Sequence, residues 1–224
     1  MLEVATGVWH WRAPHPDRTP DERWAREVSS YAVDDGTRLL LFDPLSVPGA
    51  VLALAVHRDP VVVLTAPWHE RDTRNLVESL GAPVFVPPPD TADDLVQKFG
   101  IAAEQAAGGS PDVGRLLAGD AGEGHLYAAG DRLPVGIEAR AGREHNDLVL
   151  WYDRAGALIA GDTLGDFGRG PRINERLRGG VTHEEVVERP RPLLALPIEI
   201  VLPAHGEPAD RAALERALSL RPRP

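Results

Sequence analysis

The chain of 224 residues contains no cysteine and only one lysine, Lys98. Without cysteine it can form no disulfide bond, no thiolate metal site and no cysteine nucleophile. A lysine Schiff-base mechanism is disfavoured, because a single side chain would have to supply the amine. These absences exclude disulfide scaffolds and thiol chemistry.

An excess of positive charge is also missing, since the formal net charge is −10. A surface this acidic argues against nucleic acid or an anionic membrane as the main partner. No run approaches the ~18 apolar residues that a membrane span needs, and the first residues lack the charged and apolar regions of a secretory signal. We therefore expect a cytoplasmic protein that acts on a small-molecule substrate, and the sequence leaves its oligomeric state open.

Hydrophobic residues make up 43% of the chain, which is enough to build a core and excludes global disorder. The length fits one domain of ordinary size. We therefore expect a single domain over residues 1–224.

The most informative stretch begins at residues 61–64, which are apolar and mostly β-branched and predict a buried strand. A polar turn follows, and a helical pattern runs over residues 72–80. Between them stand His69, Glu70 and Arg71. Because ligands of open α/β sheets bind beyond the carboxyl ends of the strands, this turn is the best local candidate for a site.

Two later segments have the same form. The apolar run that starts at residue 158 ends with Asp162, and the run that starts at residue 198 ends with His205. His145 stands just before a further apolar run. Histidine and aspartate side chains at successive strand ends suggest ligands that converge on one metal ion.

Several motifs carry a family resemblance. They include Gly-Asp-Thr-Leu at 161–164, Leu-Pro-Ala-His-Gly at 202–206, Ser-Ser-Tyr-Ala-Val at 29–33 and Leu-Leu-Phe-Asp at 40–43. In their order and spacing the chain resembles the metallo-β-lactamase-fold hydrolases, the superfamily that includes glyoxalase II. The resemblance implies an α/β fold, with two sheets between layers of helices in an αββα four-layer sandwich.

The resemblance also implies metal ligands. In the family, the residue matching His145 binds a first metal ion, the one matching Asp162 bridges two ions, and the one matching His205 binds the second. Imidazole and carboxylate ligands suit Zn²⁺, Mn²⁺ or Fe, which polarise water and the substrate for hydrolysis.

The main metal motif of the family, Thr-His-x-His-x-Asp-His, is altered here. Thr65 is followed by Ala-Pro-Trp-His-Glu-Arg at 66–71. Because at least two ligands are lost, we expect no more than one ion, held by His69, His145, Asp162 and His205, or no ion at all.

Two alignments of this turn are possible. If the strand fixes the register, Glu70 takes the place of the family's aspartate and Arg71 that of its last histidine. If the following helix fixes it, the loop is about two residues short and His69 takes the place of the last histidine. We favour the helix register, because a loop is shortened more easily than the spacing of a packed helix is broken.

Three functions fit these residues. The first is a metal-dependent hydrolase in which Asp162, His69 and Glu70 are the catalytic candidates. The second is a metal-free, non-catalytic family member that binds a small molecule or a protein, with Asp162 paired to Arg71. The third is a metal-free enzyme with His69 as general base, oriented by Glu70 or Asp72.

Residues 9–16 are rich in aromatic side chains and histidine and predict a loop. In the family this loop overhangs the active site, so His10 and Trp11, together with Arg71, are candidates for substrate binding. Alternatively, its tryptophans pack back on the sheet, as tryptophan beside proline often does.

The rest of the chain predicts ordinary elements. We expect a hairpin of strands 30–33 and 38–42 around an Asp-Asp-Gly turn, helices that begin at the capping sequences 91–94 and 182–185, a connector over 102–124, and an amphipathic helix over 210–220.

Overall fold

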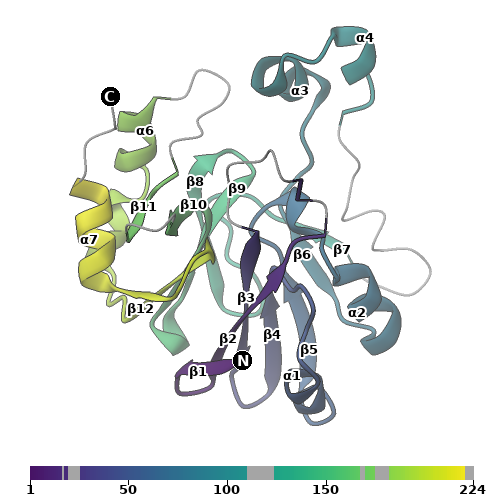
Figure 1. Ribbon diagram of the computed structural model, residues 1–224, viewed down its shortest axis with the longest axis vertical. Helices are drawn as coiled ribbons and strands as arrows, with labels where there is room; N and C mark the ends of the chain where they lie inside the picture. Colours follow the sequence, from purple (N-terminus) through teal and green to yellow (C-terminus); the bar gives the residue numbers. More distant parts are fainter. Residues whose placement is uncertain (17, 20–25, 110–123, 167–169, 175–181, 220–224) are drawn as a thin grey trace.

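Two β-sheets lie face to face in the computed structural model, which describes residues 1–16, 18–19, 26–109, 124–166, 170–174 and 182–219 (Figure 1). The first sheet has the strand order β1-β2-β3-β4-β5-β6-β7. Its strands are β1 (Leu2–Ala5), β2 (Val8–Pro14), β3 (Glu27–Asp34), β4 (Arg38–Phe42), β5 (Asp59–Val63), β6 (Val84–Val86) and β7 (Gly124–Leu126). Strands β1 to β4 are antiparallel, and β4 to β7 are parallel.

The second sheet has the order β13-β12-β10-β9-β8, with β11 paired to β10. Its strands are β8 (Ile137–Glu144), β9 (Asp147–Tyr152), β10 (Ala157–Asp166), β11 (Pro171–Ile173), β12 (Ile200–His205) and β13 (Ala209–Asp210). Strands β10 and β12 are parallel neighbours, so their carboxyl ends meet at the same edge. The apolar runs that start at residues 158 and 198 are thus strands, and the structure makes them neighbours.

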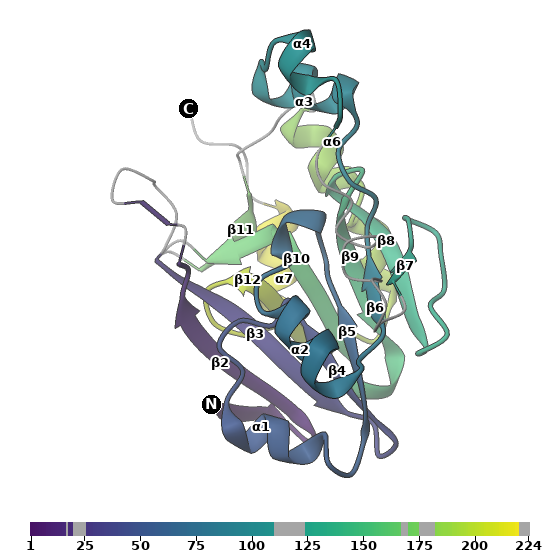
Figure 2. The same ribbon diagram turned by 90° about the vertical axis from the view of Figure 1, so that its right-hand side faces the viewer.

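Helices cover the outer face of each sheet. The helices α1 (Gly49–Leu54) and α2 (Thr73–Leu80) lie across the first sheet (Figure 2). On the outer side of the second sheet lie α6 (His183–Glu188), the 3-10 turn η3 (Arg191–Ala195) and α7 (Arg211–Ser219). Three clusters of buried side chains fill the spaces: one between the sheets, and one between each sheet and its helices. This is the αββα sandwich that the resemblance implies.

Continuous runs of apolar residues explain why the inner strands are buried on both faces. In β4, Leu40 and Phe42 point into the core between the sheets, while Leu39 and Leu41 point toward α1 and α2. Successive residues of a strand face opposite sides, so a continuous apolar run serves two cores at once. The expected hairpin of β3 and β4 is confirmed.

One expectation about the fold is wrong. Residues 9–16 do not form a loop over the site, because residues 8–14 are strand β2, paired along its length with β3. The backbone hydrogen bonds of this pairing and the burial of alternate side chains outweigh the loop-like composition.

The helices α3 (Ala92–Phe99) and α4 (Ala103–Ala106) extend beyond the sandwich (Figures 1 and 2). Thr91 and Asp94 form the capping box expected for α3, and Thr182 and Glu185 form the one expected for α6. Much of the expected connector, residues 110–123, lies outside the described residues.

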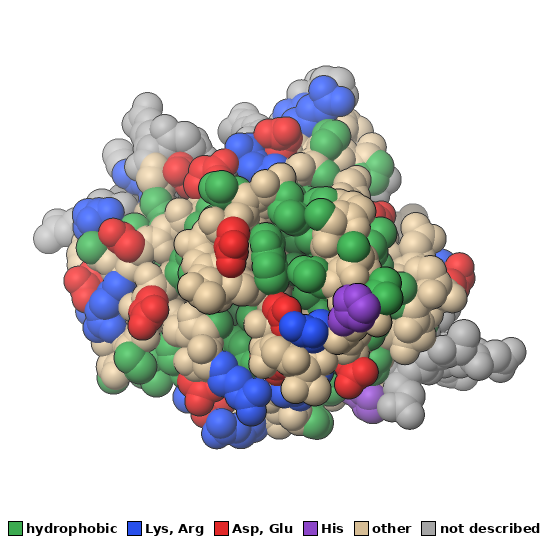
Figure 3. Space-filling view, turned by 90° about the horizontal axis from the view of Figure 1, so that it is seen from below, with side chains coloured by type: hydrophobic (Ala, Val, Ile, Leu, Met, Phe, Trp, Pro, Cys, Tyr) green, Lys and Arg blue, Asp and Glu red, His purple; other side chains and the backbone are tan. Residues whose placement is uncertain are grey.

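At the end of the molecule opposite α3 and α4, hydrophobic side chains gather among charged ones (Figure 3). Among the described residues, no helix has the length and apolar character needed to cross a membrane.

Candidate metal centre

The candidate site begins with a buried carboxylate, Asp43, which directly follows β4. Its Oδ1 accepts a hydrogen bond from the Thr65 backbone N–H at 2.8 Å, and its Oδ2 accepts one from the Thr65 hydroxyl at 2.6 Å. The same Oδ2 lies 3.1 Å from Nδ1 of His69. Asp43 thus ties the end of β4 to the turn after β5 and fixes the His69 ring through Nδ1, which leaves Nε2 for other contacts.

A close approach of the two sheets brings Asp162 to this turn. Gly161 of β10 has a φ of +51°, and a Cβ atom built there would lie 2.8 Å from the Thr65 hydroxyl oxygen. Only glycine adopts this conformation without strain and leaves room for Thr65. The missing side chain therefore lets β10 pack directly on Thr65, two residues after β5.

Two imidazole rings face the same oxygen of Asp162. Nε2 of His69 lies 3.5 Å from Asp162 Oδ1, and Nε2 of His205 lies 3.3 Å from it. This oxygen is buried and receives no hydrogen bond of ordinary geometry from the described residues. His69, Asp162 and His205 therefore come together as expected, with one nitrogen of each ring near a single carboxylate oxygen.

The other oxygen of Asp162 faces two N–H donors. The Trp68 indole N–H donates a hydrogen bond to Oδ2 at 3.2 Å. The Arg143 guanidinium Nη2 lies 3.7 Å from the same oxygen. The two oxygens thus have different surroundings: Oδ1 faces two imidazoles, which can be neutral, and Oδ2 faces a permanent cation and an indole.

The electrostatics of the cluster favour a charged His69 when no metal is bound. Burial lowers the pKa of His69, but the carboxylates of Asp43 and Asp162 outweigh burial and raise its pKa to about 9. Burial raises the pKa of Asp162, but His69 and His205 hold that pKa well below its usual range. A metal ion would therefore have to displace a proton from His69, while Asp162 is already a carboxylate.

Arg71 lies beside the site and binds backbone oxygens. Its Nη1 donates hydrogen bonds to the carbonyl oxygens of Asp43 at 2.6 Å and Ser29 at 3.0 Å. Its φ of 46° turns the backbone at this point. His69 thus contacts Asp162, whereas Arg71 binds the backbone of β3 and of the residue after β4.

Glu70 and Asp72 do not orient His69. Glu70 forms an ion pair with Arg74 of α2 at 3.3 Å. Asp72 accepts a hydrogen bond from the Ser46 backbone N–H. The carboxylate that holds His69 is Asp43, a residue that sequence reasoning assigned no role. Its position after a buried apolar strand, like that of Asp162, was the available signal.

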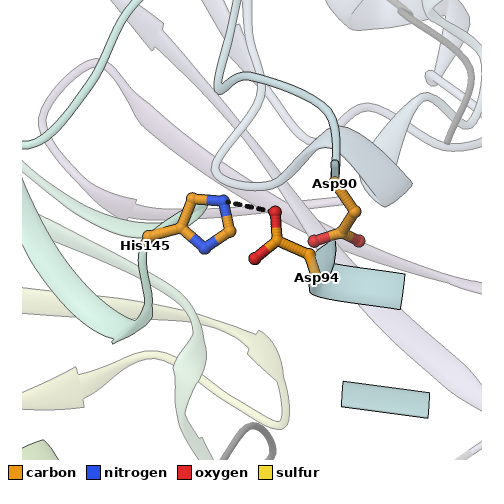
Figure 4. Close-up of side chains that lie close together, drawn as sticks. All are labelled: Asp90, Asp94 and His145. Carbon is orange, nitrogen blue, oxygen red and sulfur yellow. Dashed lines mark ion pairs between the residues drawn. The ribbon is translucent and has the colours of Figure 1, made fainter. Parts of the chain in front are cut away.

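His145 lies apart from the other three predicted ligands. Strands β8 and β9 pair through Glu144 and Asp147, so His145 and Asn146 form the two-residue turn between them. The His145 side chain is 46% exposed and points away from Asp162, with Nε2 3.5 Å from Asp94 (Figure 4). Arg143, two residues earlier in β8, lies beside Asp162 instead.

The two carboxylates near His145 already accept hydrogen bonds from other groups. Ligand atoms of His145, Asp90 and Asp94 lie within 4.8 Å of one another (Figure 4). However, Asp90 accepts a hydrogen bond from the Lys98 ammonium at 2.7 Å, and Asp94 caps α3 through Thr91. An ammonium group this close opposes the binding of a cation between these three residues.

His10 and Trp11 are buried in strand β2. His10 stacks on Tyr31 with ring centroids 5.0 Å apart, and its Nε2 lies 3.0 Å from the Ser29 hydroxyl. Trp11 donates its indole N–H to the Leu45 carbonyl at 2.7 Å. The tryptophan therefore packs back on the sheet, as the alternative interpretation proposed, and Trp68 is the indole that reaches the site.

No protein-family model matches the chain, and no curated protein matches it. Solved structures do match. The BLEG-1 B3 metallo-beta-lactamase is 17% identical, with a TM-score of 0.55 over 92% of this chain and 95% of that chain. TTHA1623 in a di-iron-bound form is 22% identical, with a TM-score of 0.54 over 85% and 93%. The metallo-beta-lactamase FIM-1 from Pseudomonas aeruginosa, in a mono-zinc form, is 13% identical, with a TM-score of 0.58 over 96% and 91%. At these identities the likeness concerns the fold.

Proposed function

We propose that this chain, which has the metallo-β-lactamase fold, is a metal-dependent hydrolase with one divalent ion between His69, Asp162 and His205. The proposal rests on what surrounds Asp162 Oδ1. This buried oxygen faces two imidazole nitrogens and receives no hydrogen bond of ordinary geometry from the described residues. Without a metal ion, only the two imidazole rings compensate the burial of this oxygen.

The donor set fits a borderline metal ion. Two imidazole nitrogens and one carboxylate oxygen are the ligand types of catalytic Zn²⁺ sites, and they also suit Mn²⁺ and Fe. Three protein ligands are characteristic of sites that keep a further position for water or substrate. When bound, such an ion activates water and polarises the bond to be hydrolysed.

The residues around the proposed ligands fix the orientation of their side chains. Asp43 holds the Nδ1 side of His69, which favours the tautomer whose Nε2 lone pair faces Asp162. Trp68 and Arg143 hold the second oxygen of Asp162 and so fix the plane of the carboxylate. Trp68 is 37% exposed next to Asp162, and it is the substrate contact that we propose.

Metal binding is the first test. We would purify the protein without a histidine tag or chelator, measure its metal content, and titrate zinc, manganese and ferrous iron into the stripped protein by calorimetry. The variants are His69→Ala and His205→Ala, and the control is His57→Ala, an exposed histidine next to β5. We expect one ion in the wild type and the control, and at least a tenfold loss of affinity in the two site variants.

Activity is the second test. Esters, thioesters, lactams and phosphodiesters would be screened with each metal. We expect turnover that a chelator abolishes and that His57→Ala retains. If the wild type binds no more metal than His69→Ala does, the metal-free, non-catalytic alternative replaces this proposal.

A further inference from the structure

Arg143 has an unusual position for an arginine. It lies at the end of β8, and only 5% of its surface is exposed. Its guanidinium faces three carboxylates: Nε lies 3.0 Å from Asp147 and 3.6 Å from Glu144, and Nη2 lies 3.7 Å from Asp162. It is therefore the permanent cation that these three anions share.

The carboxylates need such a cation because they are buried. Glu144 is 4% exposed and Asp147 is fully buried. Burial raises the pKa of Asp147 to about 7, although Arg143 opposes this shift. Burial would also lower the pKa of Arg143, but Asp147 and Asp162 raise it, so the guanidinium stays charged.

The surroundings hold Arg143 in place. Its backbone N–H donates to the Thr163 hydroxyl at 2.8 Å, which joins β8 to β10 next to Asp162. Glu144 also accepts from the Lys98 ammonium at 2.9 Å, which anchors α3 to the same corner. A side chain fixed at its backbone and at its charged end cannot move aside easily to admit another ion.

Taken with Trp68, Arg143 fills one side of Asp162. Oδ2 faces the guanidinium and the indole N–H, so only Oδ1 is left for a metal ion. A divalent cation near Oδ2 would be repelled by the guanidinium at short range in a poorly solvated place. We infer that Arg143 is a specificity-determining residue that limits this site to a single metal ion by acting as a fixed internal cation.

This inference rests on the proposed function, and its test counts ions instead of measuring turnover. Stripped wild type, Arg143→Gln and Arg143→Lys would be titrated with zinc by calorimetry, and bound zinc would be measured after gel filtration. The matched control is Arg140→Gln, in the same strand, where the side chain is 46% exposed and pairs with Glu138 on the surface.

We expect Arg143→Gln to bind one more zinc ion per chain than the wild type, because Asp147 and Asp162 lose the guanidinium beside them. Arg143→Lys keeps the charge, so it and Arg140→Gln should match the wild type. A folded Arg143→Gln that binds no additional ion would overturn the inference. If the wild type binds no zinc, the proposed function fails. The role of Arg143 is then judged separately, by whether Arg143→Gln binds a zinc ion that the wild type does not bind.

If Arg143→Gln is poorly folded without metal, thermal unfolding with and without zinc replaces the count. The inference then predicts a larger rise of Tm on adding zinc to Arg143→Gln than to the wild type or to Arg140→Gln. An equal or smaller rise would overturn it.

Discussion

Replacing Asp43 by asparagine tests how much of the metal centre depends on one buried carboxylate. Asp43 Oδ2 contacts the Thr65 hydroxyl and His69 Nδ1, and both contacts suit an acceptor. An amide at this place can keep the hydrogen bond from the Thr65 backbone through its oxygen, but its NH₂ group then faces His69. Neutral His69 would accept that N–H at Nδ1 and carry its own proton on Nε2, where a metal ligand needs a lone pair.

The size of the effect follows from these contacts. Loss of such a supporting partner lowers metal affinity by about 10–100-fold, which corresponds to about 1.4–2.8 kcal/mol. Hydrogen bonds to a charged group contribute about 1.5–3 kcal/mol to stability, which is a Tm decrease of roughly 3–12 °C in a chain of this size. The backbone tolerates the change, because Asp43 has a φ of 45° and asparagine adopts that conformation readily.

The assay is a zinc competition titration against a chelating dye, combined with thermal unfolding of the stripped protein. The matched control is Asp35→Asn, because Asp35 also accepts backbone N–H groups but lies in the β3–β4 turn at the far end of the strands. We expect both variants to lose stability and only Asp43→Asn to lose zinc affinity. Equal zinc affinity in Asp43→Asn and the wild type would refute the role given to Asp43.

Two further predictions concern Arg71 and pH. Arg71→His should add no metal ligand. It should lower the free energy of unfolding by about 2–4 kcal/mol, because two backbone carbonyls lose their donor. Higher zinc affinity of this variant in the same titration would instead support the strand register. Burial raises the pKa of Asp35, but hydrogen bonds from the Arg38 and Thr37 backbone and from the Arg38 side chain outweigh burial and lower it. Its stabilisation is therefore present above the unfolded pKa of about 3.9 and lost as pH falls through the lower folded pKa. Urea unfolding from pH 7 to pH 3 should show the gap between wild type and Asp35→Asn shrinking below about pH 4, and a constant gap would contradict this.

The sequence predicted the fold, and it also predicted that Asp162 and His205 lie close together, for a physical reason. Apolar runs mark buried strands, and polar residues at the ends of parallel neighbours meet at one edge, as Asp162 and His205 do. The motifs then identified the sandwich.

The rest depends on contacts that the sequence does not reveal. Asp43 meets Thr65 across 22 positions, and Arg143 meets Asp162 across 19. The side on which His145 points was set by the register of one hairpin, where a shift of one residue reverses the faces. Residues 8–14 became a strand because β3 offered a partner for their backbone.

The anchoring of α3 has a consequence for chemical labelling. Lys98 is the only lysine of the chain, its side chain is 7% exposed, and its ammonium contacts Asp90, Glu144 and Asn146. Although burial lowers the pKa of Lys98, the hydrogen bonds from its ammonium to Asp90 and Glu144 outweigh burial and raise it. An amine that is both hidden and protonated reacts with acylating reagents only when α3 detaches from the corner of the sandwich. The rate at which this one side chain is acylated therefore reports the opening of α3 in the unmodified protein, without an introduced probe.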